Sequence, residues 1–476
     1  MHMKASACAF ISIPCQPSSP STSEPFESWL YWYLTIHQVD QFNLTTCAMP
    51  PFKASGEPTL LPTDWKGNML PLEMLKMIID FLEYDDETLL SVLLMNKAWN
   101  EEATRVLWEA PPAQAFLSIT PMRRQLYARF VRALIFENTP TDRSLHEEFR
   151  DLEFSQLECV RIYHPCHFQF PHRHYEEFPF DQYIQRKLTT FIFQGGGSTQ
   201  EILTLLETQC PQLQHIQLAF EIRELTPERL LTFFDTCTSL KSIKLSRRVG
   251  KYVDEKVLGR LAGYSGVQKL EVRRYLDFPL FYEAFKMTSQ PFKNLRSLNL
   301  RIHSESVPLL VANVKDAPFL TSLVLQFVDT HITDSVTHIS RLHSLEKLVL
   351  LFRRSALLER TDLLELGNLS ELTKLQISPP VGHFLECPGF TDDDFISVFE
   401  NKNNLKTLFF NVYGELSMDS INSLAESCPL LVRCGVDASC ELSEWHDTCW
   451  PIFHNLQTLE VFEITYGPYA NMEEEE

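Results

Sequence analysis

The sequence predicts an α/β solenoid: a curved parallel sheet of about 13 short repeats with helices outside, preceded by a small three-helix unit. A Leu-x-x-Leu-x-Leu-type triplet recurs from residue 131 to residue 461, about every 27 residues. Between residues 70 and 108, apolar residues instead recur at three- and four-residue steps, which is typical of helices. A chain of 476 residues also exceeds the size at which one compact core stops growing, so a single globule is excluded.

Composition narrows the possible partners and the compartment. Lys and Arg number 42 against 62 Asp and Glu, a net charge of −20, which argues against a nucleic-acid partner. No apolar run approaches the roughly 20 residues of a membrane span, and residues 5–13 make a poor signal peptide. The 12 cysteines are spread without metal-ligand spacing. We expect a protein of the cytoplasm or nucleus with no cofactor and no membrane partner.

The two ends of the chain differ from the rest. Residues 1–64 contain eight prolines among Ser and Thr, so regular hydrogen bonding is repeatedly interrupted, and we expect a mostly disordered arm. Residues 467–476 form an acidic tail.

Residues 66–112 predict three short helices. The first carries one apolar face and has Pro71 in its first turn, where proline is tolerated; that face comprises Leu72, Leu75, Ile78, Ile79 and Leu82. The second, 89–94, is apolar almost all round and is expected to be buried. The third ends at Pro111-Pro112, and 113–127 follow as a linker or cap. So small a unit with surplus apolar surface predicts a partner.

This stretch resembles an F-box, on Leu70-Pro71-x-Glu73, Trp99 and Leu107-Trp108. The resemblance implies docking to the Skp adaptor of SCF-type cullin-RING ubiquitin ligases. Leu72 and the acidic run Asp85-Asp86-Glu87 depart from the family pattern. The adaptor-binding residues that it implies are Leu70, Pro71, Leu75, Ile78, Leu82, Leu90, Leu94, Trp99, Leu107 and Trp108. The alternative is an ordinary helical cap for the solenoid.

From residue 128 to 466 the triplets define the repeat. The last two apolar residues of each triplet alternate with polar ones, which predicts a short strand with one face inward. Stretches such as 227–235 and 419–426 predict the helices between strands. The phasing predicts that Leu218, Leu300 and Leu350 are buried, and that Gln217, Asn299 and Val349 lie on the concave surface.

The pattern resembles leucine-rich repeats of the cysteine-containing type. Cys210, Cys237 and Cys428 each lie three residues before a strand-opening Leu, where that subfamily has a small buried cysteine. Ile332-Thr333-Asp334 resembles its helix-opening motif. An F-box followed by such repeats is a known pairing in ligase substrate receptors.

The concave face is predicted to be locally basic. Of the 39 positions that point to it, eight are basic and four acidic, the reverse of the chain-wide ratio. We expect a substrate with an acidic or phosphorylated segment to bind there. Arg247, Arg248, Arg274, Arg353 and Arg354 follow at strand exits; the predicted binding residues are Lys244, Lys269, Arg273, Arg301, Lys347 and Lys374. The alternative is that chance alone sets this charge ratio.

The sequence gives weaker support for other candidate sites. His and Cys residues crowd 159–174, which gives either a zinc site or, as we favour, a solvated insertion. Gly195-Gly196-Gly197-Ser198 lacks the Lys of a phosphate loop and is interpreted as a flexible strand exit. The long repeat after residue 372 carries Pro379 to Leu385, which either grips a partner or packs on the flank. Nothing places a nucleophile beside a base, so no catalysis is expected.

The sequence therefore predicts a non-catalytic substrate-recognition subunit of an SCF-type ubiquitin ligase, partnered by the Skp adaptor, the cullin-RING ligase and a protein substrate. The alternative is a ligase-independent scaffold that binds proteins through its repeats.

Overall fold

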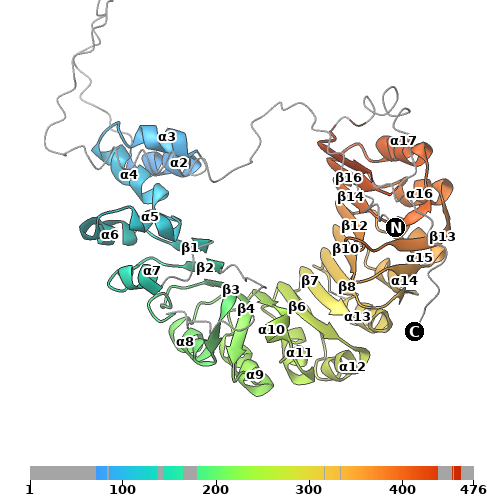
Figure 1. Cartoon of the computed structure of the whole chain (residues 1–476), viewed down its shortest axis with the longest axis horizontal. Helices are drawn as coiled ribbons and strands as arrows, with labels where there is room; N and C mark the ends of the chain where they lie inside the picture. Colours follow the sequence, from blue (N-terminus) through green and yellow to red (C-terminus); the bar gives the residue numbers. More distant parts are fainter. Residues whose placement is uncertain are drawn as a thin grey trace, which may run out of the picture. The chain divides into compact units, whose positions relative to one another are not determined.

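The computed structural model describes residues 71–82, 85–137, 143–163, 180–315, 317–332, 334–437, 453 and 455–461 (Figure 1). Two compact units divide these residues: one ends at Gly195 and the other begins at Gly196. The predicted N-terminal arm and acidic tail lie outside the described residues.

The first unit begins with the three predicted helices, α2 (Leu72–Phe81), α3 (Asp86–Val92) and α4 (Lys97–Leu107). A polar side chain at the N-cap accepts hydrogen bonds from the first turn of α3 and of α4. The Asp85 carboxylate accepts from the Thr88 N–H at 3.0 Å, and the Asn96 side chain accepts from the Ala98 N–H at 3.0 Å. Six buried residues form their shared core: Leu75, Ile79, Leu89, Val92, Ala103 and Val106.

Two details of this unit differ from the prediction. The second helix starts at Asp86 and is not buried all round, because Glu87 and Ser91 are exposed; Leu94, which was predicted to belong to it, follows the helix and is exposed. The third helix stops at Leu107, four residues before Pro111. In the stretch predicted as a linker or cap, the chain forms α5 (Ala113–Leu117) and α6 (Pro121–Ala128), and α7 (Arg143–Glu148) follows.

Three repeat strands lie at the end of this unit, β1 (Ala133–Glu137), β2 (Cys159–Tyr163) and β3 (Thr190–Thr199). They pair in parallel and in register, so that Leu134, Val160 and Phe191 are neighbours and all are buried. Strand β3 continues through Gly195–Gly197. The interpretation of these glycines as a strand exit is therefore wrong, because the strand extends to Thr199, beyond the apolar triplet.

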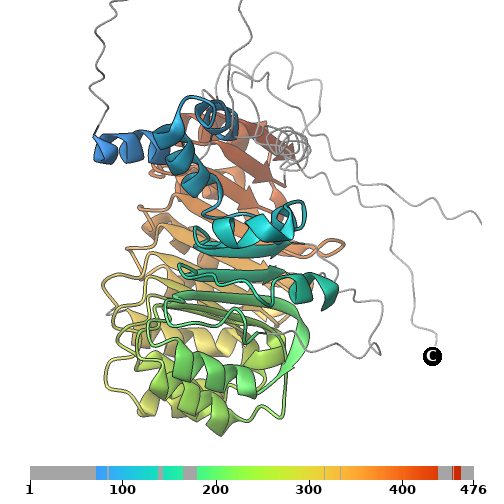
Figure 2. The ribbon, with the colours of Figure 1, turned by 90° about the vertical axis from the view of Figure 1, so that its left-hand side faces the viewer.

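In the second unit, parallel strands follow in chain order and alternate with helices. The first six strands are β4 (His215–Arg223), β5 (Ser242–Leu245), β6 (Lys269–Leu276), β7 (Ser297–Ile302), β8 (Ser322–Phe327) and β10 (Lys347–Phe352). The last four are β12 (Lys374–Ser378), β14 (Thr407–Phe410), β16 (Arg433–Val436) and β17 (Thr458–Val461). Figure 2 shows the green to yellow strands of this unit stacked side by side. With those of the first unit, a strand lies at every predicted triplet, which confirms the leucine-rich-repeat solenoid.

Helices connect these strands. The longer ones are α8 (Glu201–Gln209), α9 (Pro227–Thr236), α11 (Glu255–Ala262), α12 (Phe278–Lys286), α13 (Val307–Val314), α16 (Asp392–Phe399) and α17 (Met418–Ser427). The shorter ones are α10 (Arg247–Gly250), η1 (Ser304–Ser306), α14 (Ser335–Ile339), α15 (Arg360–Leu364) and η2 (Glu365–Asn368). In Figure 1, α9, α11, α12 and α13 cover the outer side of the sheet, and no helix of the described residues lies on its other face, which we call the open sheet face.

The strand register is the predicted one, with one exception. Leu218, Leu300 and Leu350 are buried, and Gln217 and Asn299 are partly exposed on the other face. Val349 was expected on the surface, but it is only 5% exposed. In the sheet it lies between Val324 and Gln376, and a short β-branched side chain is covered by such neighbours.

The predicted cysteine role is confirmed. Cys210, Cys237 and Cys428 are buried, and each caps the C-terminus of a helix, α8, α9 and α17 in turn. Burial raises the pKa of the Cys237 and Cys428 thiols to about 12, so both stay protonated at neutral pH.

A second sheet was not predicted. Four short strands pair in the order β15-β13-β11-β9 and are β9 (His331–Ile332), β11 (Ala356–Leu358), β13 (Leu385–Thr391) and β15 (Tyr413–Glu415). Each follows a strand of the main sheet, from β8 to β14. The insertion after residue 378 leads into β13, where Leu385 is buried while Val381 is almost fully exposed.

Candidate functional site

A bulge in β6 builds the most basic part of the open sheet face. Register between β6 and β7 holds up to Val272, which faces Leu300, and resumes at Tyr275, which faces Arg301. Arg273 and Arg274 are the additional residues on β6, and such insertions re-aim side chains locally. The bulge thus sets Tyr275 beside an arginine of the neighbouring strand.

Two guanidinium groups meet the Tyr275 ring. Arg301 Cζ lies 5.7 Å from the ring centroid, and Arg353 Cζ, just after β10, lies 5.4 Å from it. Arg273 and Arg247 are close enough to repel Arg301 electrostatically, as is Arg353. We name Arg247, Arg273, Arg301 and Arg353 with Tyr275 the arginine cluster.

The arginine cluster carries excess positive charge. Burial lowers the pKa of Arg301, and repulsion by its three arginine neighbours lowers it further. Arg273 donates to Glu271, and Lys244 Nζ lies 3.3 Å from the other oxygen of the same carboxylate. Among the described residues, Arg247, Arg301 and Arg353 form no ion pair with a carboxylate.

A second basic group lies at the strand starts. Lys347 faces Lys374 in register, and Arg433 lies two strands further on, beyond Thr407. Burial and repulsion by Lys347 and Arg433 lower the pKa of Lys374. We name these three residues the lysine row.

The six predicted substrate-binding residues therefore fall into separate groups. Arg273 and Arg301 belong to the arginine cluster, Lys347 and Lys374 to the lysine row, and Lys244 pairs with Glu271. Lys269 lies between Ser242 and Ser297 on the neighbouring strands.

The exit arginines also divide. Arg247 and Arg353 join the arginine cluster, whereas Arg274 donates to the carbonyls of Lys251 and Val253 and so holds a turn. Sequence spacing could not identify this grouping because it depends on the bulge.

The predicted adaptor-binding residues are distributed between the core and the surface of the three-helix unit. Leu70 lies outside the described residues, and Pro71, Ile78 and Leu94 are exposed. Those partly buried are Leu82, Leu90, Trp99 and Leu107. Leu75 is in the core, and Trp108 is buried against the Tyr127 ring at 4.6 Å, so both support the helices from inside.

Most of an exposed stripe on α2 was missed from the sequence, which singled out only its Ile78. Met74, Met77, Ile78 and Phe81 follow the i, i+3, i+4, i+7 spacing of one helix face and are all exposed, Met77 by 72% and Phe81 by 87%. We name these four residues the α2 stripe. Helix α2 is thus apolar on two faces. Leu75 and Ile79 meet the core, but Leu72 and Ile78, which were predicted on the same face, are exposed.

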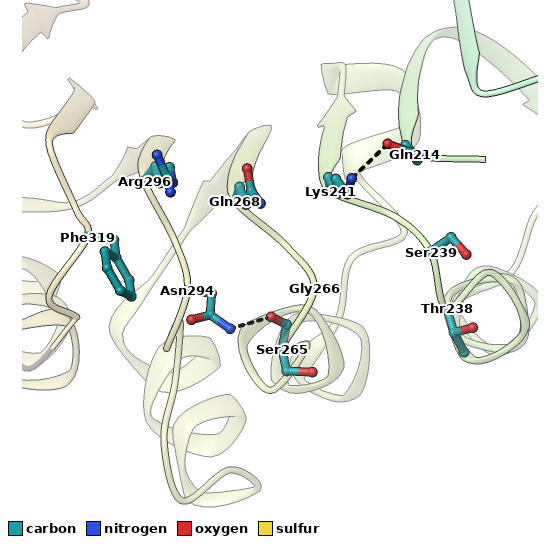
Figure 3. Close-up of a pocket in the computed structure, with 10 residues that line it drawn as sticks. All are labelled: Gln214, Thr238, Ser239, Lys241, Ser265, Gly266, Gln268, Asn294, Arg296 and Phe319. Carbon is teal, nitrogen blue, oxygen red and sulfur yellow. Dashed lines mark hydrogen bonds between the residues drawn. The ribbon is translucent and has the colours of Figure 1, made fainter. Parts of the chain in front are cut away.

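A shallow groove of about 600 Å³ lies at the residues that precede β4 to β8 (Figure 3). Lys241 Nζ donates to Gln214 at 2.9 Å, and Asn294 Nδ2 donates to the Ser265 carbonyl at 2.7 Å. These bonds join one repeat to the next, so we assign the groove to repeat packing.

The proposed zinc ligands from His164 to His174 lie outside the described residues. Within the parts of the chain that the structure describes, no group of three His, Cys, Asp or Glu side chains is placed to hold a metal ion. No helix in those parts is long and apolar enough to cross a bilayer.

Comparisons with known proteins found similar solved structures but no family. No family model matches the sequence, and no curated protein does. The leucine-rich-repeat protein LegL7 from Legionella pneumophila is 12% identical, covers 53% of this chain and 82% of its own, and has a TM-score of 0.28.

Two solved complexes are also similar. The yeast Rad7 and Elc1 complex is 13% identical over 78% of this chain and 87% of that chain, with a TM-score of 0.32. The mouse RP105/MD-1 complex is 13% identical over 65% and 59%, with a TM-score of 0.29. All three scores are low, so the fold assignment depends on the strand order and register of the chain itself.

Proposed function

We propose that this protein is the substrate-recognition subunit of an SCF-type cullin-RING ubiquitin ligase. In this proposal the three-helix unit binds the Skp adaptor, and the open sheet face of the second unit binds the protein to be ubiquitinated. The chain performs no catalysis itself. The observation that carries the proposal is the exposed α2 stripe, in a unit whose sequence resembles an F-box.

The stripe favours a docking unit over a mere cap. A terminal cap of a solenoid presents a polar outer face to water. Here Met77 and Phe81 are among the most exposed large apolar side chains of the described residues. Fully burying one such side chain stabilises by about 1.5–3 kcal/mol, so a partner that covers the stripe gains several times that amount before association costs.

The open face of the repeats supports the second half of the proposal. Solenoids bind proteins along such extended surfaces. The arginine cluster and the lysine row make this face locally positive within a chain of net charge −20, which favours encounter with acidic segments.

Adaptor binding tests the proposal directly. In full-length protein, Met77→Asp combined with Phe81→Asp should lower affinity for purified Skp adaptor at least 100-fold, because each carboxylate would be buried against apolar surface without a partner. Both side chains are exposed, so folding should be retained, which circular dichroism checks. Lys76→Asp, also exposed on α2 but outside the stripe, is the matched control and should stay within threefold of wild type.

Two results would contradict the proposal. If the wild-type chain binds neither adaptor nor cullin while its repeats still bind proteins, it is a ligase-independent scaffold. If the double variant binds the adaptor as tightly as wild type, the α2 stripe is not the docking surface.

A further inference from the structure

We propose that the arginine cluster is a recognition site for one phosphate monoester, carried on a phosphorylated side chain of the protein bound at the open sheet face. This inference rests on the proposed protein-binding role of that face. It does not depend on adaptor docking.

The positive charge of the arginine cluster that no carboxylate neutralises matches the negative charge of a phosphate dianion. Arg247, Arg301 and Arg353 have no carboxylate partner among the described residues, and Arg301 is repelled by three other guanidinium groups. A phosphorylated side chain carries about −1.5 to −2 charges at pH 7 and three acceptor oxygens. A carboxylate carries one charge and two oxygens, so it would leave more of the repulsion unrelieved.

The side-chain type also fits phosphate. All four cations are arginines, whose planar forks form paired charge-assisted hydrogen bonds to phosphate oxygens. The lysine row presents two lysines and one arginine, and none of the three forms a cation–π contact with an aromatic ring of the described residues. We therefore assign the phosphate to the arginine cluster and only electrostatic attraction to the lysine row.

Tyr275 preorganises the site. Its ring holds Arg301 and Arg353 at 5.7 and 5.4 Å, although they come from strands separated by β8. The backbone beneath them is fixed, because the Arg353 N–H donates to the Phe327 carbonyl at 3.1 Å and Arg301 lies within β7. Side chains that are already oriented lose less freedom on binding, so more of the interaction remains as affinity.

Glu271 is an internal competitor for the same arginines. Its carboxylate accepts from Arg273 and lies 3.3 Å from Lys244 Nζ. A bound phosphate, with its higher charge, can displace this carboxylate from Arg273. A bound carboxylate has no such advantage over Glu271, so it does not displace it. Removing the Glu271 charge should therefore strengthen phosphate binding, and it should also reduce discrimination between phosphate and carboxylate.

The test uses purified full-length protein and fluorescein-labelled degenerate peptide libraries. One library has a central phosphoserine or phosphothreonine, a second has the unphosphorylated residue, and a third has Glu there. Fluorescence polarisation should show at least tenfold tighter binding of the phosphorylated library than of either other one.

Single substitutions distinguish binding at the arginine cluster from a general effect of positive charge. Arg353→Gln and Arg301→Gln should each weaken phosphopeptide binding about tenfold or more, while Arg341→Gln, an exposed arginine after α14, should change it less than twofold. Glu271→Gln should tighten binding. Arg353 is exposed, so its substitution tests the site even if Arg301→Gln proves unstable in a thermal melt.

Several results would overturn the inference. Equal affinity for the phosphorylated and Glu libraries would mean that the open sheet face binds negative charge without a preference for phosphate. Inorganic phosphate or pyrophosphate that binds as tightly as the phosphopeptides would mean that the ligand is a small molecule. No binding of any library, or loss of binding with Arg341→Gln as large as with Arg353→Gln, would also refute it. None of these results bears on adaptor docking, which the α2 variants test.

Discussion

Replacement of the buried ammonium of Lys402 by a methyl group should sharply destabilise the second unit. Lys402 is 0% exposed, and its Nζ donates to three main-chain carbonyls, those of Leu366 and Gly367 at 2.9 Å and of Leu369 at 2.6 Å. These oxygens lie at the end of η2, where a helix leaves most of its last carbonyls without intrahelical donors. The Leu366 oxygen also accepts from the Leu369 N–H at 3.1 Å. Burial lowers the Lys402 pKa to about 8, so the group still carries most of its charge at pH 7.

The expected magnitude follows from these three bonds. A hydrogen bond to a charged group contributes about 1.5–3 kcal/mol. Lys402→Met removes three such bonds and takes the donor from the carbonyl oxygens of Gly367 and Leu369, whereas the Leu366 oxygen keeps the Leu369 N–H at 3.1 Å. Against that, the variant no longer has to remove an ammonium from water, which costs several kcal/mol. We expect a net loss of about 2–4 kcal/mol, because each of the two buried carbonyl oxygens left unsatisfied costs about 1–3 kcal/mol.

Urea unfolding followed by circular dichroism measures this loss. Lys406→Met is the matched control: the same substitution four residues later, at an exposed side chain, should change stability by less than about 0.5 kcal/mol. A Lys402→Met midpoint indistinguishable from that of Lys406→Met, at equal slopes, would refute the assigned role of the ammonium.

Two further predictions address the register and the pH response. Leu300→Ala should cost about 2–5 kcal/mol and Asn299→Ala about half a kcal/mol or less, because only Leu300 is fully buried; equal urea midpoints would contradict the repeat phasing. Burial lowers the pKa of His146 to about 4, so between pH 6.5 and 4 the unfolded chain binds a proton that the folded chain does not, and stability should fall with decreasing pH by up to about 3 kcal/mol. The Tyr183 hydroxyl lies 2.9 Å from Nδ1 of His146, and His146→Asn keeps a hydrogen-bond partner for it. This variant should show a smaller decrease of stability between pH 6.5 and 4, measured by urea unfolding at each pH. The same decrease in variant and wild type would contradict the assigned role of His146.

Regular parts of the fold were predictable because they repeat. The triplet spacing located every strand of the main sheet, since each unit buries the same inward positions, such as Leu218 and Leu300. The apolar periodicity of residues 71–107, with Pro71 in a first turn, likewise located three helices.

Irregular parts were not predictable from a periodic pattern. The bulge at Arg273 and Arg274 shifts the register locally, and only the paired strand reveals it. The second sheet is made of two- to seven-residue strands, too short to give a period. On α2, both faces are apolar, and sequence alone does not say which one meets the core.

The second sheet makes the solenoid mechanically uneven. From β8 to β15, successive repeats are joined by two hydrogen-bonded ladders, whereas among the described residues the repeats of β4 to β7 are joined by one. Backbone amides in the doubly joined block should therefore open together and exchange slowly with solvent, while the preceding repeats bend more easily. The arginine cluster includes residues from both parts of the solenoid. Arg353 precedes β11 in the doubly joined repeats, whereas Arg247 follows β5 and Arg273 lies in β6, in the singly joined repeats. An anion held by all of them would act as a clamp, fixing the curvature of the compliant repeats to that of the block.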